Sequence, residues 1–392
     1  MIRFAVVFVA VAVCGITRLP AADVAAAPSS TSNLAGVMAA CLEEGALAGA
    51  VVLVTDRDRT LLHEAAGFAD LAAGRPMAAD SLFWIASMTK PITAAAVMIL
   101  VDEGRVRLDE PVATYLPEFR DIWVAEAKEA DRMVLRRPAR PFTVADALSH
   151  SSGLPFKSPV EIPALDLLPL ATAVRCYAQM PLLFDPGTGY QYANSGINAA
   201  GRIIEVVSGM PYEAFLEKRL FEPLGMTDTT FRPTAAQVAR LATSYRRDEA
   251  AGKLMPVRID QLTYPLDGPG RYPMPGGGLF STAADCGRFC RLLLGDGMVA
   301  GKRILSEEAV RRMRTRQTPE SVQQSYGLGL QIHGDGSYGH GGAFATDLTV
   351  DKAKGTATVW LVQDADGKKP SNACRAVVQR WLAAQPWAAP SR

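Results

Sequence analysis

The chain has 392 residues, of which 49% are hydrophobic and 21% are charged, so it holds enough apolar side chains for a large core and is not generally disordered. The 33 glycines and 26 prolines are ordinary for this length and exclude a collagen-like or linker-like chain. The formal net charge of +1 gives no strongly basic surface, so we expect no nucleic-acid partner.

The N-terminus predicts export. Arg3 is followed by the apolar run 4–13 and then by small residues. A membrane-spanning helix needs about 20 residues, so this shorter run is typical of a secretory signal peptide. We expect residues 1–27 to be that signal peptide, with cleavage between Ala22 and Ala27, and the mature protein to be periplasmic or secreted.

Two alternatives apply to this N-terminus. The apolar run is also compatible with a buried N-terminal helix or strand. A lipoprotein anchor at Cys14 is disfavoured, because the residue before such a cysteine should be small and is here Val13. No other segment is long and apolar enough to predict a membrane span.

Five cysteines follow Cys14, and an odd number in an exported chain leaves at least one thiol unpaired. No disulfide framework is needed for a core of this size, and the pairing stays open. Cys286 and Cys290 stand four apart on a predicted helix without a histidine nearby, so we expect small buried hydrophobes rather than zinc ligands. We expect neither a metal nor a cofactor.

The predicted elements begin after a polar tether at 28–33. A helix over 34–44 precedes two strands, 48–55 and 60–66, which the charged turn 56–59 joins as a hairpin. Apolar residues at three-four spacing predict the strongest helix over 87–103. The middle, about 105–270, is predicted helical with many loops, and the charged stretch 121–140 resembles a surface insertion. Its expected helices are 142–149, 195–208 and 212–220.

After a glycine turn at 276–278 we expect a helix over 282–294, strands over 338–342, 345–351 and 356–363, and an amphipathic helix over 370–384. Strands at both ends with helices between them predict an α+β fold, in which one antiparallel sheet with flanking helices is built from both chain ends. The sheet lobe would take about 35–86 and 276–392, and an inserted, mostly helical lobe would take about 87–275. Ligands prefer the cleft between such lobes.

The first chemical motif is Ser87-Met88-Thr89-Lys90, at the start of the strongest helix. Side chains three apart on a helix share a face. A serine hydroxyl needs a base before it can act as a nucleophile, and a desolvated lysine can lose its charge and act as that base. The alternative is a serine cap followed by an exposed lysine.

The second motif is Tyr192-Ala193-Asn194, in the stretch YQYANSG before a predicted helix. The spacing puts a phenol and an amide on one side of an extended loop. A phenolate near a lysine can take a proton from serine, and the amide can hold a substrate carbonyl. A loop tyrosine with an asparagine cap is the alternative.

The third motif is His340-Gly341-Gly342, at the opening of a predicted strand. Glycines let a substrate approach the backbone closely. The N–H of Ala343 would then pair with that of Ser87 as an oxyanion hole. A simple glycine turn is the alternative.

In this order the three motifs resemble the class C branch of the serine β-lactamases, with Ser-x-x-Lys, Tyr-x-Asn and a His/Lys-x-Gly strand. The chain is identified as a member of the β-lactamase-related serine hydrolase family, which also holds family VIII carboxylesterases, D-aminopeptidases and D,D-peptidases. The resemblance covers about residues 35–385, and three further stretches carry it: LSHSSGLP at 148–155, PLGMTDT at 223–229 and GGLFSTA at 277–283.

The resemblance implies a serine β-lactamase or penicillin-binding-protein-like fold, with Ser87 as the acylating nucleophile, Lys90 and Tyr192 as the general acid/base pair, and Asn194 orienting the substrate. His340 takes the place that lysine holds in class C β-lactamases, and histidine occurs there among esterase and amidase relatives. Lysine gives a substrate carboxylate a fixed positive charge, whereas histidine is mostly neutral at pH 7. Arg271 is a candidate for replacing that charge.

The other histidines, His63, His150 and His333, form no metal motif, and Gly-x-Ser-x-Gly is absent, which disfavours a metallohydrolase and an α/β-hydrolase elbow. We therefore expect a serine hydrolase with a covalent acyl-enzyme on Ser87, carboxylesterase-like, acting on a small-molecule ester. A β-lactamase or a D-peptidase acting on β-lactams or D-amino-acid peptides is the alternative, and an inactive binding relative is the lesser one. The natural substrate and the oligomeric state stay open.

Overall fold

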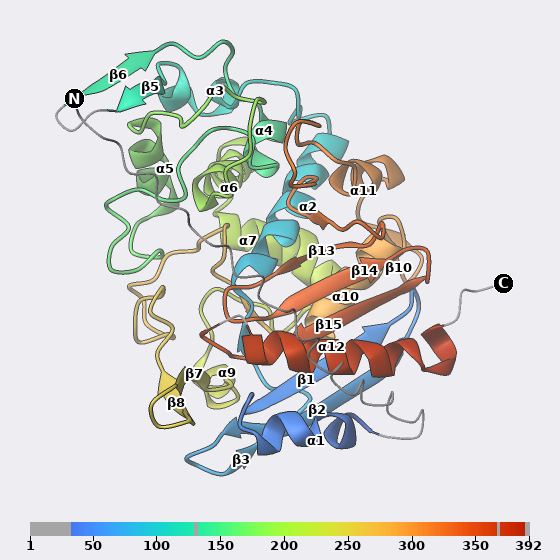
Figure 1. Cartoon of the computed structure of the whole chain (residues 1–392). Coiled ribbons are helices and arrows are strands. Elements are labelled where there is room, and N and C mark those ends of the chain that lie inside the picture. Colours follow the sequence, from blue (N-terminus) through green and yellow to red (C-terminus); the bar gives the residue numbers. More distant parts are fainter. Residues whose placement is uncertain (1–32, 129–131, 367–368, 389–392) are drawn as a thin grey trace, which may run out of the picture.

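A computed structural model describes residues 33–128, 132–366 and 369–388 (Figure 1). The predicted signal peptide, Cys14 and nearly all of the tether lie outside these residues. The centre of the fold is a seven-stranded sheet in the order β12-β13-β14-β15-β1-β2-β3, and every neighbouring pair in it is antiparallel. Its strands are Gln331–Ile332, Tyr338–Gly341, Asp347–Asp351, Thr356–Leu361, Gly49–Thr55, Thr60–Asp70 and Arg75–Pro76.

Strands β1 and β15 lie side by side, so both ends of the chain share one sheet, as the sequence predicted. Every residue of β1 is buried, because helices cover both faces of the sheet. Helix α10 (Ala283–Leu294) packs on one face, where a Cβ at Gly287 would lie 2.7 Å from the Leu53 side chain. Helices α1 (Leu34–Glu43) and α12 (Lys369–Ala383) cover the other face (Figure 1). The predicted α+β class is confirmed.

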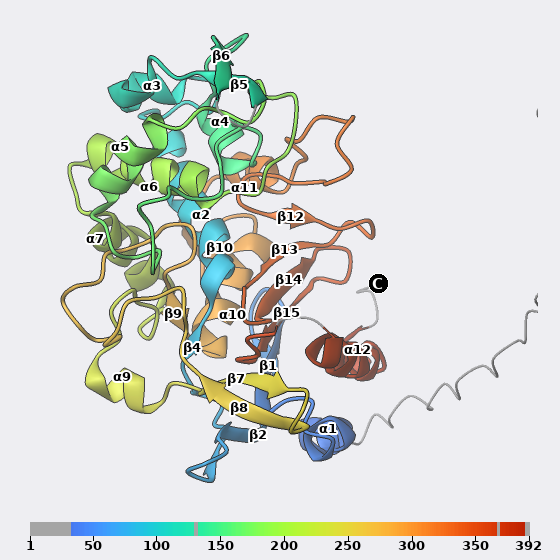
Figure 2. The same ribbon diagram turned by 60° about the vertical axis from the view of Figure 1, so that its left-hand side comes forward.

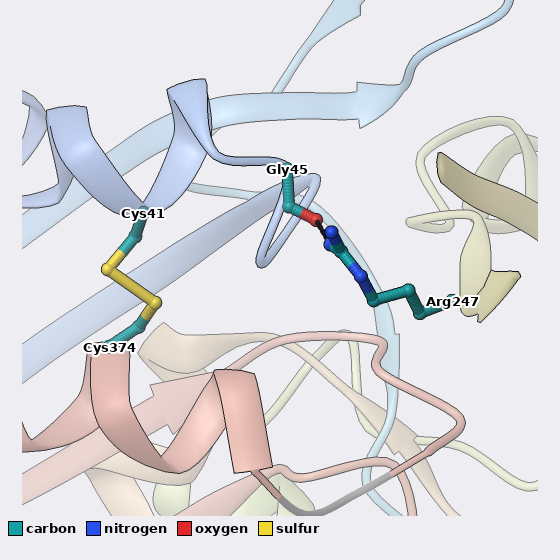
Figure 3. Close-up of a disulfide and its surroundings, with 4 residues drawn as sticks. All are labelled: Cys41, Gly45, Arg247 and Cys374. Carbon is teal, nitrogen blue, oxygen red and sulfur yellow. Dashed lines mark hydrogen bonds between the residues drawn. A yellow bond between two sulfur atoms is a disulfide. The ribbon is translucent and has the colours of Figure 1, made fainter. Parts of the chain in front are cut away.

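A disulfide between Cys41 and Cys374 joins α1 to α12, across 333 positions of sequence (Figure 3). Near it, Arg247 donates a hydrogen bond to the carbonyl of Gly45 at 2.9 Å, which ties the end of α1 to strand β7 (Ser244–Asp248). Sequence analysis left this pairing open. Cys286 and Cys290 are free and buried, as predicted.

Helix α2 (Thr89–Asp102) runs between the helices of the middle region of the chain and the sheet (Figure 2). All residues from Thr89 to Leu100 are buried, since α6 (Asn194–Ser208), α11 (Glu307–Met313) and β13 pack around it. The helix was predicted to begin at residue 87, but the chain there forms a 3₁₀ turn, Ala86–Met88, that leads into α2. Around α6 lie α3 (Val112–Tyr115), α4 (Val144–Leu148), α5 (Leu170–Ala178) and α7 (Tyr212–Leu216).

The predicted helix 212–220 extends further than expected. A π-helical turn, Glu217–Phe221, and α8 (Glu222–Leu224) continue it as far as Gly225, whose positive φ of 69° ends it. A short α9 (Ala235–Ala239) follows. Within the described residues, no helix is both long and apolar enough to cross a membrane.

Two hairpins in the middle region were not predicted. The charged stretch 121–140 forms β5 (Val124–Lys128) and β6 (Met133–Arg136), and β7 (Ser244–Asp248) pairs with β8 (Lys253–Val257). Another small pair, β10–β11, is Met298–Val299 with Lys302–Arg303. The division into two lobes at 86/87 and 275/276 stays a prediction.

One short pairing positions the site. Strand β4 (Phe83–Trp84) pairs with β9 (Phe280–Ser281). It thereby brings the chain just before Ser87 beside the chain that follows the glycine turn 276–278.

Candidate active site

Ser87 and Lys90 face each other, as their spacing predicted. Ser87 lies in the 3₁₀ turn that leads into α2, and Lys90 lies one turn later. The Lys90 amine contacts Ser87 Oγ at 3.0 Å, the Asn194 amide oxygen at 2.8 Å and the Gly276 carbonyl at 2.5 Å. These three partners come from distant parts of the chain.

Burial changes the protonation of this amine. Lys90 is fully buried, and the loss of solvation holds its pKa well below the ordinary value of 10.5. The oxygens of Asn194 and Gly276 can only accept. A neutral amine gives its two hydrogens to these oxygens, which leaves its lone pair for the Ser87 hydroxyl. The geometry therefore suits a base directed at Ser87.

Tyr192 lies beside Lys90 and borders the same cavity as Ser87. Burial raises the pKa of its phenol, and the nearby Ser87 hydroxyl opposes this shift only in part. The Lys90 amine lies 4.7 Å from the centre of the Tyr192 ring. The phenolate considered from the sequence is thus disfavoured in the resting site, and a neutral phenol can donate a proton instead.

Asn194 begins α6 and is almost fully buried. Its amide oxygen accepts from Lys90 rather than facing open space. Gly276 is packed so closely that a Cβ there would lie 2.8 Å from this oxygen. The Gly276 N–H donates to Asn198 Oδ1 at 2.8 Å, which fixes the carbonyl that Lys90 uses.

The backbone beside Ser87 has the form of an oxyanion hole. Ala86 has a positive φ of 45°, and within the described residues the N–H groups of Ser87 and Ala343 have no acceptor. Gly342 lies against the same turn, and a Cβ there would lie 2.6 Å from the Ile85 carbonyl. Such free N–H groups can stabilise a developing oxyanion.

His340 lies on β13 with both ring nitrogens engaged. Nδ1 donates to the Gly341 carbonyl at 2.6 Å, and Nε2 accepts from the Tyr326 hydroxyl at 2.9 Å. Burial, with a smaller effect of Lys90, lowers the pKa of His340 to about 3. The imidazole is therefore neutral, and its one N–H points to the Gly341 carbonyl.

The hypothesis that Arg271 replaces the missing charge is wrong. Its guanidinium is buried in an ion pair with Asp166 at 2.7 Å. It also donates to the carbonyls of Phe231 and Leu266. All of these partners lie within the protein, so Arg271 holds loops together, and it is not among the described residues that line the cavity over Ser87.

Sequence analysis missed His150, which formed no motif. It is buried behind the Tyr192 ring, with ring centroids 4.6 Å apart, and its Nδ1 accepts the N–H of Ala193. Its position within LSHSSGLP, a stretch that carried the family resemblance, was the available signal.

A cavity of about 420 Å³ opens over Ser87. It is bordered by Tyr192, Asn194 and the 340–343 segment. Among the described residues that line it, none is Asp, Glu, Lys or Arg. The other large side chains around it are those of Trp84, Phe156, Leu165, Gln261, Met274 and Gln331.

Comparisons with known proteins show which proteins this chain resembles over most of its length. Protein Rv1367c of Mycobacterium tuberculosis is 35% identical over 84% of this chain and 89% of its own length. Esterase EstB of Burkholderia gladioli is 33% identical over 66% of this chain and 69% of its own length. Lovastatin esterase of Penicillium rubens is 33% identical, with 66% and 68% covered.

Among solved structures, EstCE1, a hydrolase with promiscuous acyltransferase activity, matches with a TM-score of 0.73 and 25% identity, over 90% of this chain and 97% of its own. A variant of simvastatin synthase from Aspergillus terreus shares the fold, with a TM-score of 0.75 and 22% identity, over 90% and 96% of the two chains. The model of the Beta-lactamase family matches residues 34–380. The chain therefore belongs to the beta-lactamase family, whose members include esterases and penicillin-binding proteins.

Proposed function

We propose that this protein is a serine hydrolase that forms a covalent acyl-enzyme on Ser87 and prefers uncharged esters. The observation that carries the substrate preference is the cavity over Ser87, which no charged side chain lines. The similarity to EstB and to lovastatin esterase supports it.

In acylation, the Ser87 oxygen attacks the ester carbonyl while its proton passes to the neutral Lys90 amine. The N–H groups of Ser87 and Ala343 receive the carbonyl oxygen as it becomes negative. Tyr192, whose buried phenol has a raised pKa and is therefore neutral, donates a proton to the departing alcohol. Water then attacks the acyl-enzyme and gives one proton to the Tyr192 phenolate. The bond between the acyl group and the Ser87 oxygen breaks, protonated Lys90 returns its proton to that oxygen, and the acid is released.

The missing cation argues against β-lactams. A β-lactam carries a carboxylate, and His340 is a neutral imidazole whose nitrogens are both engaged. Arg271 is paired with Asp166. A charge-assisted hydrogen bond exceeds a neutral one by roughly 1 kcal/mol, which is about fivefold in rate. An uncharged ester loses nothing from this difference.

Export is part of the proposal. The N-terminal pattern of Arg3, an apolar run and small residues is that of a signal peptide. The Cys41–Cys374 disulfide supports it, because disulfides form and persist in oxidising compartments such as the periplasm or the extracellular space.

The first prediction concerns the nucleophile. Ser87→Ala should lower the turnover of p-nitrophenyl butyrate by several orders of magnitude, with an unchanged circular dichroism spectrum, because the attacking oxygen is gone. Intact-mass spectra should show a fluorophosphonate adduct on the wild type and on Ser195→Ala, the matched control. An adduct on Ser87→Ala would contradict the assignment.

The second prediction concerns pH. Lys90 works as a base only when neutral, so kcat/KM should rise tenfold per pH unit below its pKa and level off above it. The lowered pKa places that plateau well below the ordinary lysine value of 10.5. Lys90→Ala should lose most of the rate and also the limb of the profile in which kcat/KM rises with pH. Lys302→Ala, an exposed control, should keep both. A limb that persists in Lys90→Ala would mean that another group is the base.

The third prediction concerns the substrate. The wild type should have a higher kcat/KM for p-nitrophenyl butyrate than for nitrocefin. His340→Lys should have a higher kcat/KM for nitrocefin than the wild type, since it places a cation on the strand. His340→Gln is the neutral control and should not gain. A wild type that prefers nitrocefin tenfold or more would replace the esterase proposal with a β-lactamase.

The fourth prediction concerns export. Protein from the native cell should begin between about Asp23 and Ser30, and non-reducing peptide mapping should find Cys41 linked to Cys374. Cys176, which is free in the structure, serves as the internal control for thiol labelling. Recovery of intact Met1 with a reduced Cys41 from the cytosol would refute the proposal.

A further inference from the structure

His150 is an unusual residue behind the site. It is only 1% exposed and has a positive φ of 63°, a conformation that few non-glycine residues adopt. Three tyrosine rings surround its imidazole, those of Tyr190, Tyr192 and Tyr326, with ring centroids at 5.8, 4.6 and 4.7 Å. A strained backbone conformation persists only where the surrounding structure holds it.

Two hydrogen bonds join His150 to the loop that carries Tyr192. The His150 carbonyl accepts the N–H of Gln191 at 2.9 Å, and its Nδ1 accepts the N–H of Ala193 at 3.2 Å. The two donors flank Tyr192 on either side. One residue therefore holds the loop on both sides of the phenol, through its main chain and through its side chain.

The donor at Ala193 settles the tautomer of His150. A nitrogen that accepts an N–H carries no proton, so the hydrogen of the neutral ring is on Nε2. Within the described residues Nε2 has no hydrogen-bond partner, and it is enclosed by the tyrosines. Burial and the nearby Lys90 and His340 keep the pKa of His150 well below its ordinary value, so Nδ1 stays available as an acceptor.

The segment around His150 is itself anchored. Ser151 donates its N–H to the Asp146 carbonyl in α4 and accepts the N–H of Gly187, both within 3.0 Å. Further along, the Phe156 carbonyl accepts the N–H of Asn194 at 3.0 Å. The segment 146–156 thus forms a rigid backing for the loop 187–194, and His150 is its contact point behind Tyr192.

We propose that His150 is a positioning residue for acylation, which sets the Tyr192 phenol against Ser87 by holding the backbone at Gln191 and Ala193. The proposal rests on the proposed function, and it assigns His150 no contact with substrate. A small displacement of a catalytic group can lower a rate about a hundredfold, so the loss of this support should appear in kcat.

The test compares two variants of one residue. His150→Leu removes the acceptor for the Ala193 N–H and replaces the imidazole with an apolar side chain of similar size. His150→Asn keeps an acceptor oxygen near the place of Nδ1, and asparagine tolerates a positive φ. We expect His150→Leu to lose about 10- to 100-fold in kcat for p-nitrophenyl butyrate at nearly unchanged KM. His150→Asn should recover most of that loss.

Two controls separate positioning from folding. His63→Leu changes a histidine on β2 whose ring contacts the Ala79 carbonyl, and it should leave kcat unchanged. Urea unfolding should show His150→Leu folded under the assay conditions. Equal kcat values for wild type and His150→Leu would overturn the positioning role alone.

A second measurement does not depend on the substrate. The rate of fluorophosphonate labelling of Ser87 should fall in His150→Leu and recover in His150→Asn. Long-range ¹H–¹⁵N spectra of the wild type should show an unprotonated Nδ1 on His150 from about pH 5 to 8, the range in which an ordinary histidine titrates. A His150 that titrates there would overturn the proposal. A wild type that is not labelled at all would overturn the proposed function itself.

Discussion

The burial of one amine constrains the whole site. A buried ammonium is costly unless it is paired with a charge, and the partners of Lys90 are a hydroxyl, an amide oxygen and a carbonyl. The low-energy form is therefore the neutral amine, which is also the form that can accept a proton. The same three contacts bring together the 3₁₀ turn before α2, the start of α6 and the glycine turn 276–278. Burial of Lys90 thus makes the base and assembles the segments around it.

The local part of this arrangement could be predicted from sequence, because it depends on spacing within one element. Ser87 and Lys90 share a helix face, and the sheet strands and the helix α2 follow from their apolar periodicity. Partners that lie far apart in the chain carry no such signal. The Cys41–Cys374 pair is separated by 333 positions, and Arg271 pairs with Asp166 across 105 positions. Sequence analysis identified those residues without their partners, and it passed over His150 because its role depends on a distant loop.

Basic side chains around the cavity are either paired with an acid or held in their neutral form. Arg271 and Asp166 are both almost fully buried and neutralise each other, and the histidine on β13 is held in its neutral form by burial. Positive charge is therefore either paired or removed near Ser87. A substrate meets a surface of aromatic rings, amides and backbone N–H groups, which recognises shape and a carbonyl group rather than a net charge.

The covalent link between α1 and α12 also has a mechanical consequence. Since β1 pairs with β15, and a disulfide joins the helices beside them, a force applied outside the two cysteines reaches this covalent bond before it reaches the sheet. The 333 positions between the two cysteines correspond to a contour length on the order of 1,100 Å when extended. That length cannot be drawn out while the bond is intact. An unfolding protease that pulls on the chain therefore meets the disulfide before it can extend the segment 41–374.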